Sequence, residues 1–167
     1  MNMLKKIVFY DDLNDEAKEK AMEWFRDNED FPFLEDDMTE FVKTELGEAG
    51  YIVEDLRVFY SLGYCQGDGA SFTATLIKNG ETYEVNRNDS RYNHEMTINE
   101  VYHETDEGEE TDEAEKLEEM RTIARRAEKY GYDIIEYTLS YDSVEDSIRI
   151  NEYTFTTDGE RMNPDNF

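Results

Sequence analysis

The sequence predicts an α+β fold in which helices pack on one face of an antiparallel meander of about four strands. Apolar residues recur at helical spacing near both ends of the chain, whereas residues 51–103 alternate between apolar and polar, as half-buried strands do. With 167 residues, of which 38% are hydrophobic and 13% aromatic, the chain can bury a sizeable core. No internal repeat or flexible linker divides it, so residues 1–167 are expected to form a single acidic domain.

The first elements expected are a short strand over residues 5–10 and a helix over about 14–27. Asn14 is the expected N-cap residue of that helix, because its side-chain oxygen can accept a hydrogen bond from an N–H of the first turn. A second apolar stripe predicts a helix from Leu34 to Ala49. Gly50 follows it in the position of a left-handed cap.

Four strands are expected in the middle of the chain, and two turn signals separate them. A glycine-rich turn joins the first strand to the second, and Asn79-Gly80 is a strong hairpin signal between the second and the third. A polar stretch precedes the fourth. The strands are expected around residues 55–62, 71–76, 83–85 and 95–103.

The last third of the chain predicts two helices and a short strand. Thr111 is the expected cap of a helix that begins in an acid-rich segment. Gly131 either breaks this helix or is tolerated inside it. Ser143 is expected to begin a short last helix, and Tyr153 and Phe155 to form a strand.

Charge is the outlying property of the sequence. The chain has 17 Lys and Arg against 43 Asp and Glu, which gives a net charge of −26. Such a surface repels free nucleic acid and anionic membranes, which excludes both as direct partners, and it attracts a basic protein surface or a hard cation. Duplex DNA carries about one charge per 1.7 Å, so this net charge is roughly that of 13 base pairs.

The acids concentrate in two segments. Ten acids and one Lys fall within residues 104–119, which are expected to form an acid-rich loop and helix start, and a second cluster surrounds the first helix–helix junction. Two other interpretations stay open: acidic runs are often plain solvated surface, and acidic proteins also occur as an adaptation to high salt. The candidate partner-binding residues are Glu104, Asp106, Glu107, Glu109, Glu110, Asp112, Glu113 and Glu115 in the first cluster and Glu35, Asp36 and Asp37 in the second.

The most distinctive local string is YCQGDGASF, in the turn between the first two strands of the meander. Gly63, Gly67 and Gly69 are expected to supply positive φ angles, and Asp68 to bond nearby backbone, so the turn is interpreted as structural. A phosphate-binding loop would need a Lys after the glycines and then a helix. A calcium loop would need acids at alternate positions and a Glu at the twelfth. The sequence has neither pattern.

Cysteine and histidine give no sign of an active site. Cys65 would need a base to act as a nucleophile, and neither His94 nor His103 has a sequence signature that connects it to the thiol, which is expected to be packed. The two histidines and neighbouring acids (Glu95, Glu100 and Glu104) match no metal-ligand spacing and are expected to be ordinary surface residues. No catalytic residue, metal or cofactor is predicted.

Three strings resemble a family of small phage-encoded proteins, some of which are labelled antitoxin-like. They are LNDEAKEKAMEWF, FYSLGYCQGDGASF and NEYTFTTDGER, and YCQGDGASF is the most specific part. The family carries no established activity, so the resemblance implies no catalytic residues. It implies a phage setting, in which small acidic proteins often block host defence nucleases by imitating DNA. The acid-rich residues 104–115 are not part of the resemblance.

The sequence therefore favours a non-enzymatic inhibitor. The expected partner is a basic nucleic-acid-binding protein of the bacterial host, such as a CRISPR effector or a restriction enzyme. One alternative is an antitoxin-like regulator that binds a basic toxin or host enzyme without imitating DNA. Another is a cation-dependent enzyme or calcium buffer. A homodimer is an open expectation.

The expected location is the cytoplasm of the infected host. A single Cys forms no internal disulfide, which suits a reducing compartment. The N-terminal apolar run is too short for a signal peptide, and no segment approaches the ~20 apolar residues that span a membrane.

Overall fold

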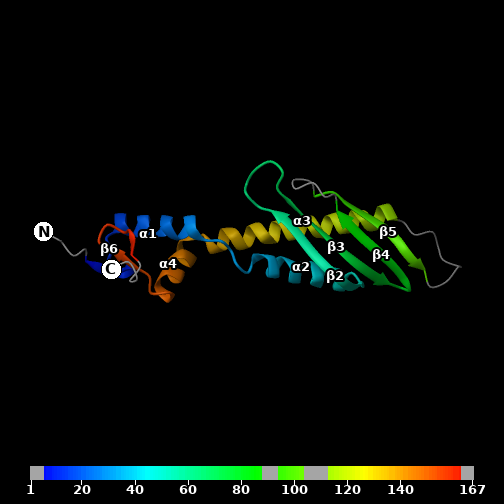
Figure 1. Cartoon of the computed structure of the whole chain (residues 1–167), viewed down its shortest axis with the longest axis horizontal. Coiled ribbons are helices and arrows are strands. Elements are labelled where there is room, and N and C mark those ends of the chain that lie inside the picture. Colours follow the sequence, from blue (N-terminus) through cyan, green and yellow to red (C-terminus); the bar gives the residue numbers. More distant parts are fainter. Residues whose placement is uncertain (1–5, 88–93, 104–112, 163–167) are drawn as a thin grey trace. The chain divides into compact units, whose positions relative to one another are not determined.

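The computed structural model describes residues 6–87, 94–103 and 113–162. The expected α+β class is confirmed, because the described residues contain four α-helices and two sheets of antiparallel strands (Figure 1). The chain divides into two compact units, residues 1–31 with 135–167 and residues 32–134. The expectation of a single domain stays a prediction.

The unit of residues 32–134 contains the predicted meander. Its strands are β2 (Ile52–Ser61), β3 (Gly69–Lys78), β4 (Glu81–Arg87) and β5 (Met96–His103), in the order β2-β3-β4-β5. Asn79 and Gly80 have φ angles of 53° and 77°, which is the two-residue turn whose twist matches that of paired strands. The predicted hairpin is therefore confirmed.

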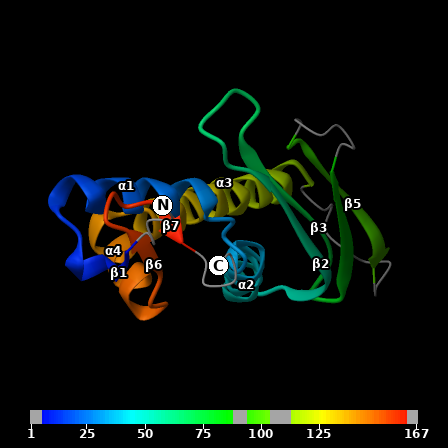
Figure 2. The same cartoon turned by 60° about the vertical axis from the view of Figure 1, so that its left-hand side comes forward.

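Two helices cover one face of this sheet. α2 (Leu34–Glu48) and the part of α3 (Glu113–Thr138) in this unit lie on the same side of the strands (Figure 2). Fully buried residues from both helices and from the strands form the core. They are Met38, Val42, Leu46, Met120 and Ala127 on the helices and Phe72, Leu76 and Tyr83 on the strands. The left-handed cap expected at Gly50 is confirmed by its φ of +96°.

Gly131 is tolerated inside α3, which runs through it without a break. Neighbouring side chains leave no room for a Cβ at this position, because it would lie 2.5 Å from Leu62 Cδ1 and 2.9 Å from Met38 Sδ. The preceding residue, Tyr130, stacks on Phe41 of α2 with ring centroids 4.6 Å apart. Close approach of α3 to α2 and to Leu62, directly after β2, therefore requires glycine here.

The other unit joins the two ends of the chain. Its elements are β1 (Ile7–Phe9), a 3₁₀ turn over Tyr10–Asp12, α1 (Asp15–Asn28), α4 (Tyr141–Ile150), β6 (Thr154–Thr156) and β7 (Arg161–Met162). The strands form an antiparallel sheet in the order β1-β6-β7, a pairing that the sequence analysis did not predict. Tyr10, Met22, Ile148 and Phe155 are fully buried in its core.

The ends of the elements follow local chemistry. The N-cap role expected for Asn14 is confirmed, since its Oδ1 accepts a 2.8 Å hydrogen bond from the N–H of Ala17. The first strand ends earlier than expected, because Tyr10 turns into the core and its carbonyl accepts a bond from the N–H of Leu13. No helix in the described residues is both long enough and apolar enough to cross a membrane.

Candidate functional site

The turn between β2 and β3 is organised by the carboxylate of Asp68. It accepts hydrogen bonds from the backbone N–H groups of Gly63 at 3.1 Å and Cys65 at 3.2 Å, and from the hydroxyl of Tyr132 on α3. Desolvation pushes the pKa of Asp68 upward, but the hydrogen bonds from Gly63 and Cys65 outweigh it and lower the pKa. The expected backbone bonds of Asp68 are therefore present, and α3 anchors the turn.

The glycines of this turn serve different purposes. Gly67 has the expected positive φ, at +93°, but the same expectation for Gly63 and Gly69 is wrong, and Tyr64 takes a left-handed φ of 56° instead. Gly69 is required by space, because a Cβ there would lie 2.8 Å from Cδ2 of His94. The sequence could not show this, since the histidine comes from another part of the chain.

Cys65 is exposed, so the expectation that its thiol is packed is wrong. The thiol lies 3.4 Å from the Asp68 carboxylate. Its hydrogen bond to that carboxylate, and then the negative charge itself, raise the pKa of the thiol above its ordinary value. Because the thiolate is the nucleophilic form, this arrangement disfavours nucleophilic chemistry at Cys65.

The acid-rich candidate surface is only partly described. Glu104, Asp106, Glu107, Glu109, Glu110, Asp112 and the expected cap Thr111 lie outside the described residues. Glu113 and Glu115 are exposed in the first turn of α3, and Glu113 Oε1 accepts a 3.2 Å hydrogen bond from the N–H of Glu100. Acids at this end of a helix are also favoured by its dipole.

Farther along α3, Glu118 and Glu119 have partners within the molecule. Glu118 forms ion pairs with Arg125 at 2.8 Å and with Arg121 at 3.7 Å, and the bond from Arg125 is the main reason that the pKa of Glu118 is lowered. Glu119 is half-buried and bonds to Tyr51, whose pKa is raised by burial and by this carboxylate. The acidic surface that the sequence predicted over residues 104–119 is therefore weaker at its C-terminal end.

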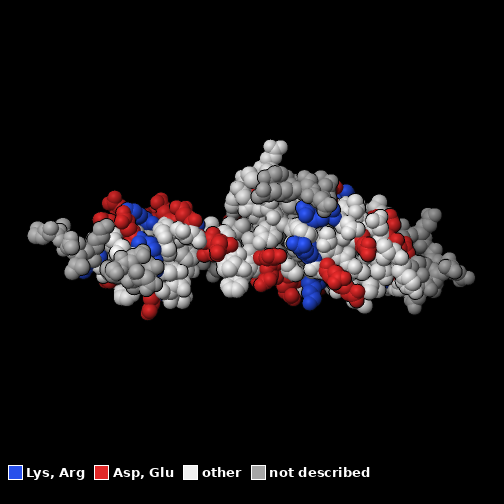
Figure 3. All heavy atoms as spheres, viewed as in Figure 1, with Lys and Arg blue, Asp and Glu red and all other residues white. Residues whose placement is uncertain are grey.

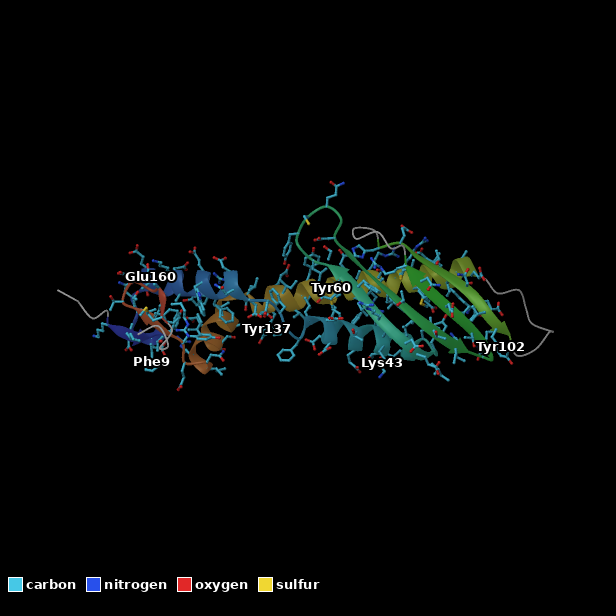
Figure 4. All side chains as sticks on the ribbon, viewed as in Figure 1. Phe9, Lys43, Tyr60, Tyr102, Tyr137 and Glu160 are labelled. Atoms are coloured by element: carbon cyan, nitrogen blue, oxygen red, sulfur yellow. The ribbon has the colours of Figure 1, made fainter. Side chains whose placement is uncertain are left out.

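The second cluster is exposed at the start of α2. Glu35, Asp36 and Asp37 form the first turn of this helix, and no ion pair among the described residues involves them. The N-cap residue, Phe33, provides no side-chain acceptor, so these acids also balance the helix dipole. Figure 3 shows acidic side chains gathered along α2, with Lys43, labelled in Figure 4, among them.

The acids of α2 have the linear density of a nucleic acid strand. The helix carries six acids and one Lys over 15 residues, or about 22 Å at 1.5 Å per residue. One strand of B-DNA carries a phosphate about every 3.4 Å, and therefore about six over the same length. Of the six acids, only Glu45 is paired among the described residues, with Arg126 at 2.5 Å.

The histidines do not form a metal centre in the described part of the chain, where no group of three or more His, Cys, Asp or Glu side chains converges. The side chain of His103 is outside that part. His94 is half-buried rather than a surface residue as expected, since its ring packs on Gly69 and its Nδ1 lies 3.5 Å from Ser71 Oγ.

Sequence reasoning missed a concave site beside His94. It has a volume of about 330 Å³, and Tyr60, labelled in Figure 4, marks its position. Arg57 and Arg87 reach it from β2 and β4, and both guanidinium groups lie against the ring of Phe59. The lining residues are Glu35, Arg57, Val58, Phe59, Tyr60, Arg87 and His94. The only signal in the sequence was the presence of two Arg on strands of a very acidic protein.

Comparison with known protein families, with curated proteins and with solved structures finds no match for this chain.

Proposed function

We propose that the protein is a non-enzymatic inhibitor that presents an acidic helix to a basic nucleic-acid-binding surface of a host protein. The observation that carries the proposal is the charge spacing of α2, whose six acids over about 22 Å match the phosphate density of one nucleic acid strand. A groove built to follow a phosphate backbone would meet a similar density of charge on this helix. The resemblance to phage proteins suggests a bacterial defence nuclease as the target, either a CRISPR effector or a restriction enzyme.

Two features support α2 as the contact surface. Its acids Asp36, Asp37 and Glu40 are exposed, so a partner can reach them without unfolding the helix. In contrast, Glu118 on α3 is already paired with two Arg side chains. An acid that is neutralised internally offers little attraction to an external Arg or Lys. The exposed Glu113 and Glu115, together with the acids of residues 104–112, are proposed as a second part of the contact.

The turn that carries Cys65 supports a binding role rather than a catalytic one. The Asp68 carboxylate holds the thiol protonated by raising its pKa, which is the opposite of what a nucleophilic cysteine needs. Asp68 itself is occupied with the backbone of Gly63 and Cys65 and with Tyr132. These groups hold the turn on α3, and the proposal assigns no chemical step to them.

Charge attraction of this kind predicts a strong dependence on salt. If about five acids each replace one phosphate contact, affinity should fall by as much as ~10²–10³-fold between about 50 and 200 mM NaCl. The loss is at most this large, because an isolated helix condenses fewer counterions than duplex DNA. Association should be fast at low salt, since steering acts mainly on the association rate.

The test combines identification of the partner with competition. Purified protein is used to capture partners from a bacterial lysate at about 50 mM NaCl, and a purified partner is then titrated in increasing salt and with excess duplex DNA or guide RNA. A mimic is displaced by the nucleic acid. A partner that stays bound supports the antitoxin-like alternative, and an affinity that is unchanged from ~50 to ~500 mM NaCl contradicts charge mimicry.

A matched pair of variants localises the contact. The triple variant Asp36→Asn, Asp37→Asn, Glu40→Gln removes three exposed charges from α2. The control triple variant Glu16→Gln, Glu19→Gln, Glu23→Gln removes three exposed charges from α1. The proposal expects a much larger loss of binding and of nuclease inhibition from the α2 variant, and equal losses would show that net charge alone acts.

A further inference from the structure

A concave pocket lies between the 3₁₀ turn that follows β1 and the last turn of α4, in the unit that joins the two ends of the chain. Its volume of about 360 Å³ falls within the range of small-ligand sites. Phe9, labelled in Figure 4, marks its position. The lining residues all lie in described parts of the chain and are Phe9, Tyr10, Asp11, Asp12, Ile148, Arg149, Glu152 and Tyr153.

Aromatic rings form part of the pocket wall. Phe9 is 55% exposed, and its ring has no aromatic or cationic partner among the described residues. Tyr153 is half-buried and packs edge-on against Trp24, with ring centroids 5.2 Å apart. The face of an aromatic ring attracts cations, and this unit already uses one in that way, since Arg149 lies 5.3 Å from the ring centroid of Tyr10. The exposed ring of Phe9 therefore offers a surface to a further cation.

Carboxylates outnumber positive charges in the pocket wall. Three acids line it, whereas Arg149 is the one basic residue among the lining residues. Arg149 is already paired within the unit, because its Nε lies 2.9 Å from Asp11 Oδ1 and its Nη2 lies 3.6 Å from Glu145 Oε2. The other two acids, Asp12 and Glu152, are exposed, and their side chains form no ion pair or hydrogen bond among the described residues. Two carboxylates therefore remain available to a cation in the pocket.

The backbone fixes Glu152 at the C-terminal end of α4. Glu152 follows the C-cap residue Asn151 and has a left-handed φ of 52°, in a position that usually holds glycine. Its N–H donates a 3.0 Å hydrogen bond to the carbonyl oxygen of Arg149, which holds the turn. This end of a helix also carries partial negative charge, which favours a cation. A glutamate is less stable here than glycine would be, and a binding role for its carboxylate accounts for its presence.

We infer that this pocket binds the guanidinium group of an arginine side chain from a partner protein. A guanidinium is planar, so it can lie flat on the ring of Phe9 while its fork of N–H donors faces the carboxylates of Asp12 and Glu152. The ammonium group of lysine is a compact point charge, which meets the carboxylates but does not stack on the ring. The pocket therefore prefers arginine to lysine.

The charge of the pocket also selects the source of the arginine. Free arginine carries its own α-carboxylate, which Asp12 and Glu152 repel, whereas an arginine within a polypeptide has none. A net charge of −26 attracts partners with a basic surface, on which arginine is abundant. The pocket lies outside the unit that contains α2, so the inference goes beyond the inhibitory function proposed for that helix and does not depend on it.

The experiment is an NMR titration of the full chain at constant ionic strength with N-acetyl-arginine amide, in which both ends of the amino acid are blocked. The blocked amides of lysine and citrulline and free arginine are titrated in parallel, each to ~10 mM, which is ten times a 1 mM Kd. The signals followed are the backbone amides of residues 9–12 and 148–153 and the indole N–H of Trp24, the one Trp in the chain, which packs on Tyr153.

Blocked arginine should give a saturable shift of these signals. Blocked lysine should bind more weakly, and citrulline, which has nearly the same shape without the charge, should not bind. Free arginine should bind more weakly than blocked arginine. Tighter binding of the free amino acid would contradict the assignment to a partner protein, and lysine binding as tight as arginine would contradict the preference for a guanidinium.

Variants separate the pocket from general charge. The double variant Asp12→Asn, Glu152→Gln should weaken binding of blocked arginine about tenfold, since each exposed ion pair contributes up to roughly fivefold. The control double variant Glu16→Gln, Glu19→Gln removes two exposed charges from α1 in the same unit, outside the pocket, and should leave binding unchanged.

Two single variants test the ring and the fold. Phe9→Leu keeps an apolar side chain but removes the ring, so it should reduce the preference for arginine over lysine. Glu152→Gly removes a carboxylate and relieves the left-handed backbone, so binding should weaken while the melting temperature stays the same or rises. No saturable shift, equal effects of the two double variants, or citrulline binding as tight as arginine would each overturn the inference.

Discussion

Replacement of Gly131 by Ala tests how closely α3 approaches its neighbours. The added Cβ would lie 2.5 Å from Leu62 Cδ1 and 2.9 Å from Met38 Sδ, both far inside ordinary contact distance. Met38 is fully buried, so its side chain has little room to move away. The substitution therefore sets two effects of opposite sign against each other in one residue, helix propensity and overpacking.

The relative size of the two effects decides whether the substitution stabilises or destabilises the protein. An Ala in place of Gly inside a helix gains about 0.5–1 kcal/mol of stability, because it restricts the unfolded chain. Overpacking of a well-packed core costs about 1–3 kcal/mol. Gly131→Ala should therefore lower the free energy of unfolding by roughly 1 kcal/mol, with the overpacking effect larger than the helix effect.

Gly47 provides the matched control. It also lies in a helix of the same unit, but a Cβ there would meet nothing within 4 Å, so Gly47→Ala should stabilise by about 0.5–1 kcal/mol. The assay is urea unfolding followed by circular dichroism, with a shift in midpoint at constant m-value for both variants. If Gly131→Ala is as stable as Gly47→Ala, the close packing of α3 described above is incorrect.

The remaining predictions concern Gly159, Asp68 and the total charge of the chain. Gly159→Ala should destabilise by about 2–5 kcal/mol in a Trp24 fluorescence melt, because φ is +87° and the Cβ would lie 2.2 Å from the backbone oxygen of Ala17; a wild-type midpoint would refute this. Asp68→Asn should speed alkylation of Cys65 at about pH 8, because the carboxylate no longer raises the thiol pKa, and an unchanged rate would argue against that contact. The stability lost in this variant should be largest above pH ~4, near the unfolded pKa, and disappear as pH falls through the lower folded pKa of Asp68. Finally, raising NaCl from about 50 to 500 mM should raise the melting temperature, because screening weakens the self-repulsion of a chain with a net charge of −26; a lower melting temperature would contradict this.

The acidity of the protein is distributed in two physically different ways. On α2 five of the six acids are exposed and, among the described residues, outside ion pairs, so their field extends into solvent; Glu45 is half-buried and paired with Arg126. On α3 basic residues accompany the acids, and pairs such as Glu118 with Arg125 cancel locally. The six acids and one Lys of α2 give it a net charge of −5, whereas the seven acids and five basic residues of α3 give it only −2. The proposed contact surface depends on this difference, and so does the choice of variants that test it.

Local elements were predictable from the sequence, because neighbouring residues determine them. Asn14 caps α1 with its own side chain, and Asn79-Gly80 adopts the turn that its backbone freedom allows. The alternation of residues 51–103 indicated the meander before any strand was paired. The total charge and the acidic start of α2 were likewise properties of the chain alone.

Tertiary structure decided which of these residues act together. Glu118 is neutralised by Arg residues on its own helix, and Gly69 is needed because the His94 ring lies against it. Arg57 and Arg87 are thirty residues apart in the chain and lie on β2 and β4, which β3 separates, yet both guanidinium groups lie against the ring of Phe59. The sequence by itself determined how much charge the protein carries and the type of most of its elements. It did not fix where each element begins, since the last helix was expected from Ser143 and starts at Tyr141. Contacts within the folded chain decided where that charge stays available, because the spacing of neighbouring residues does not encode which distant segments pair.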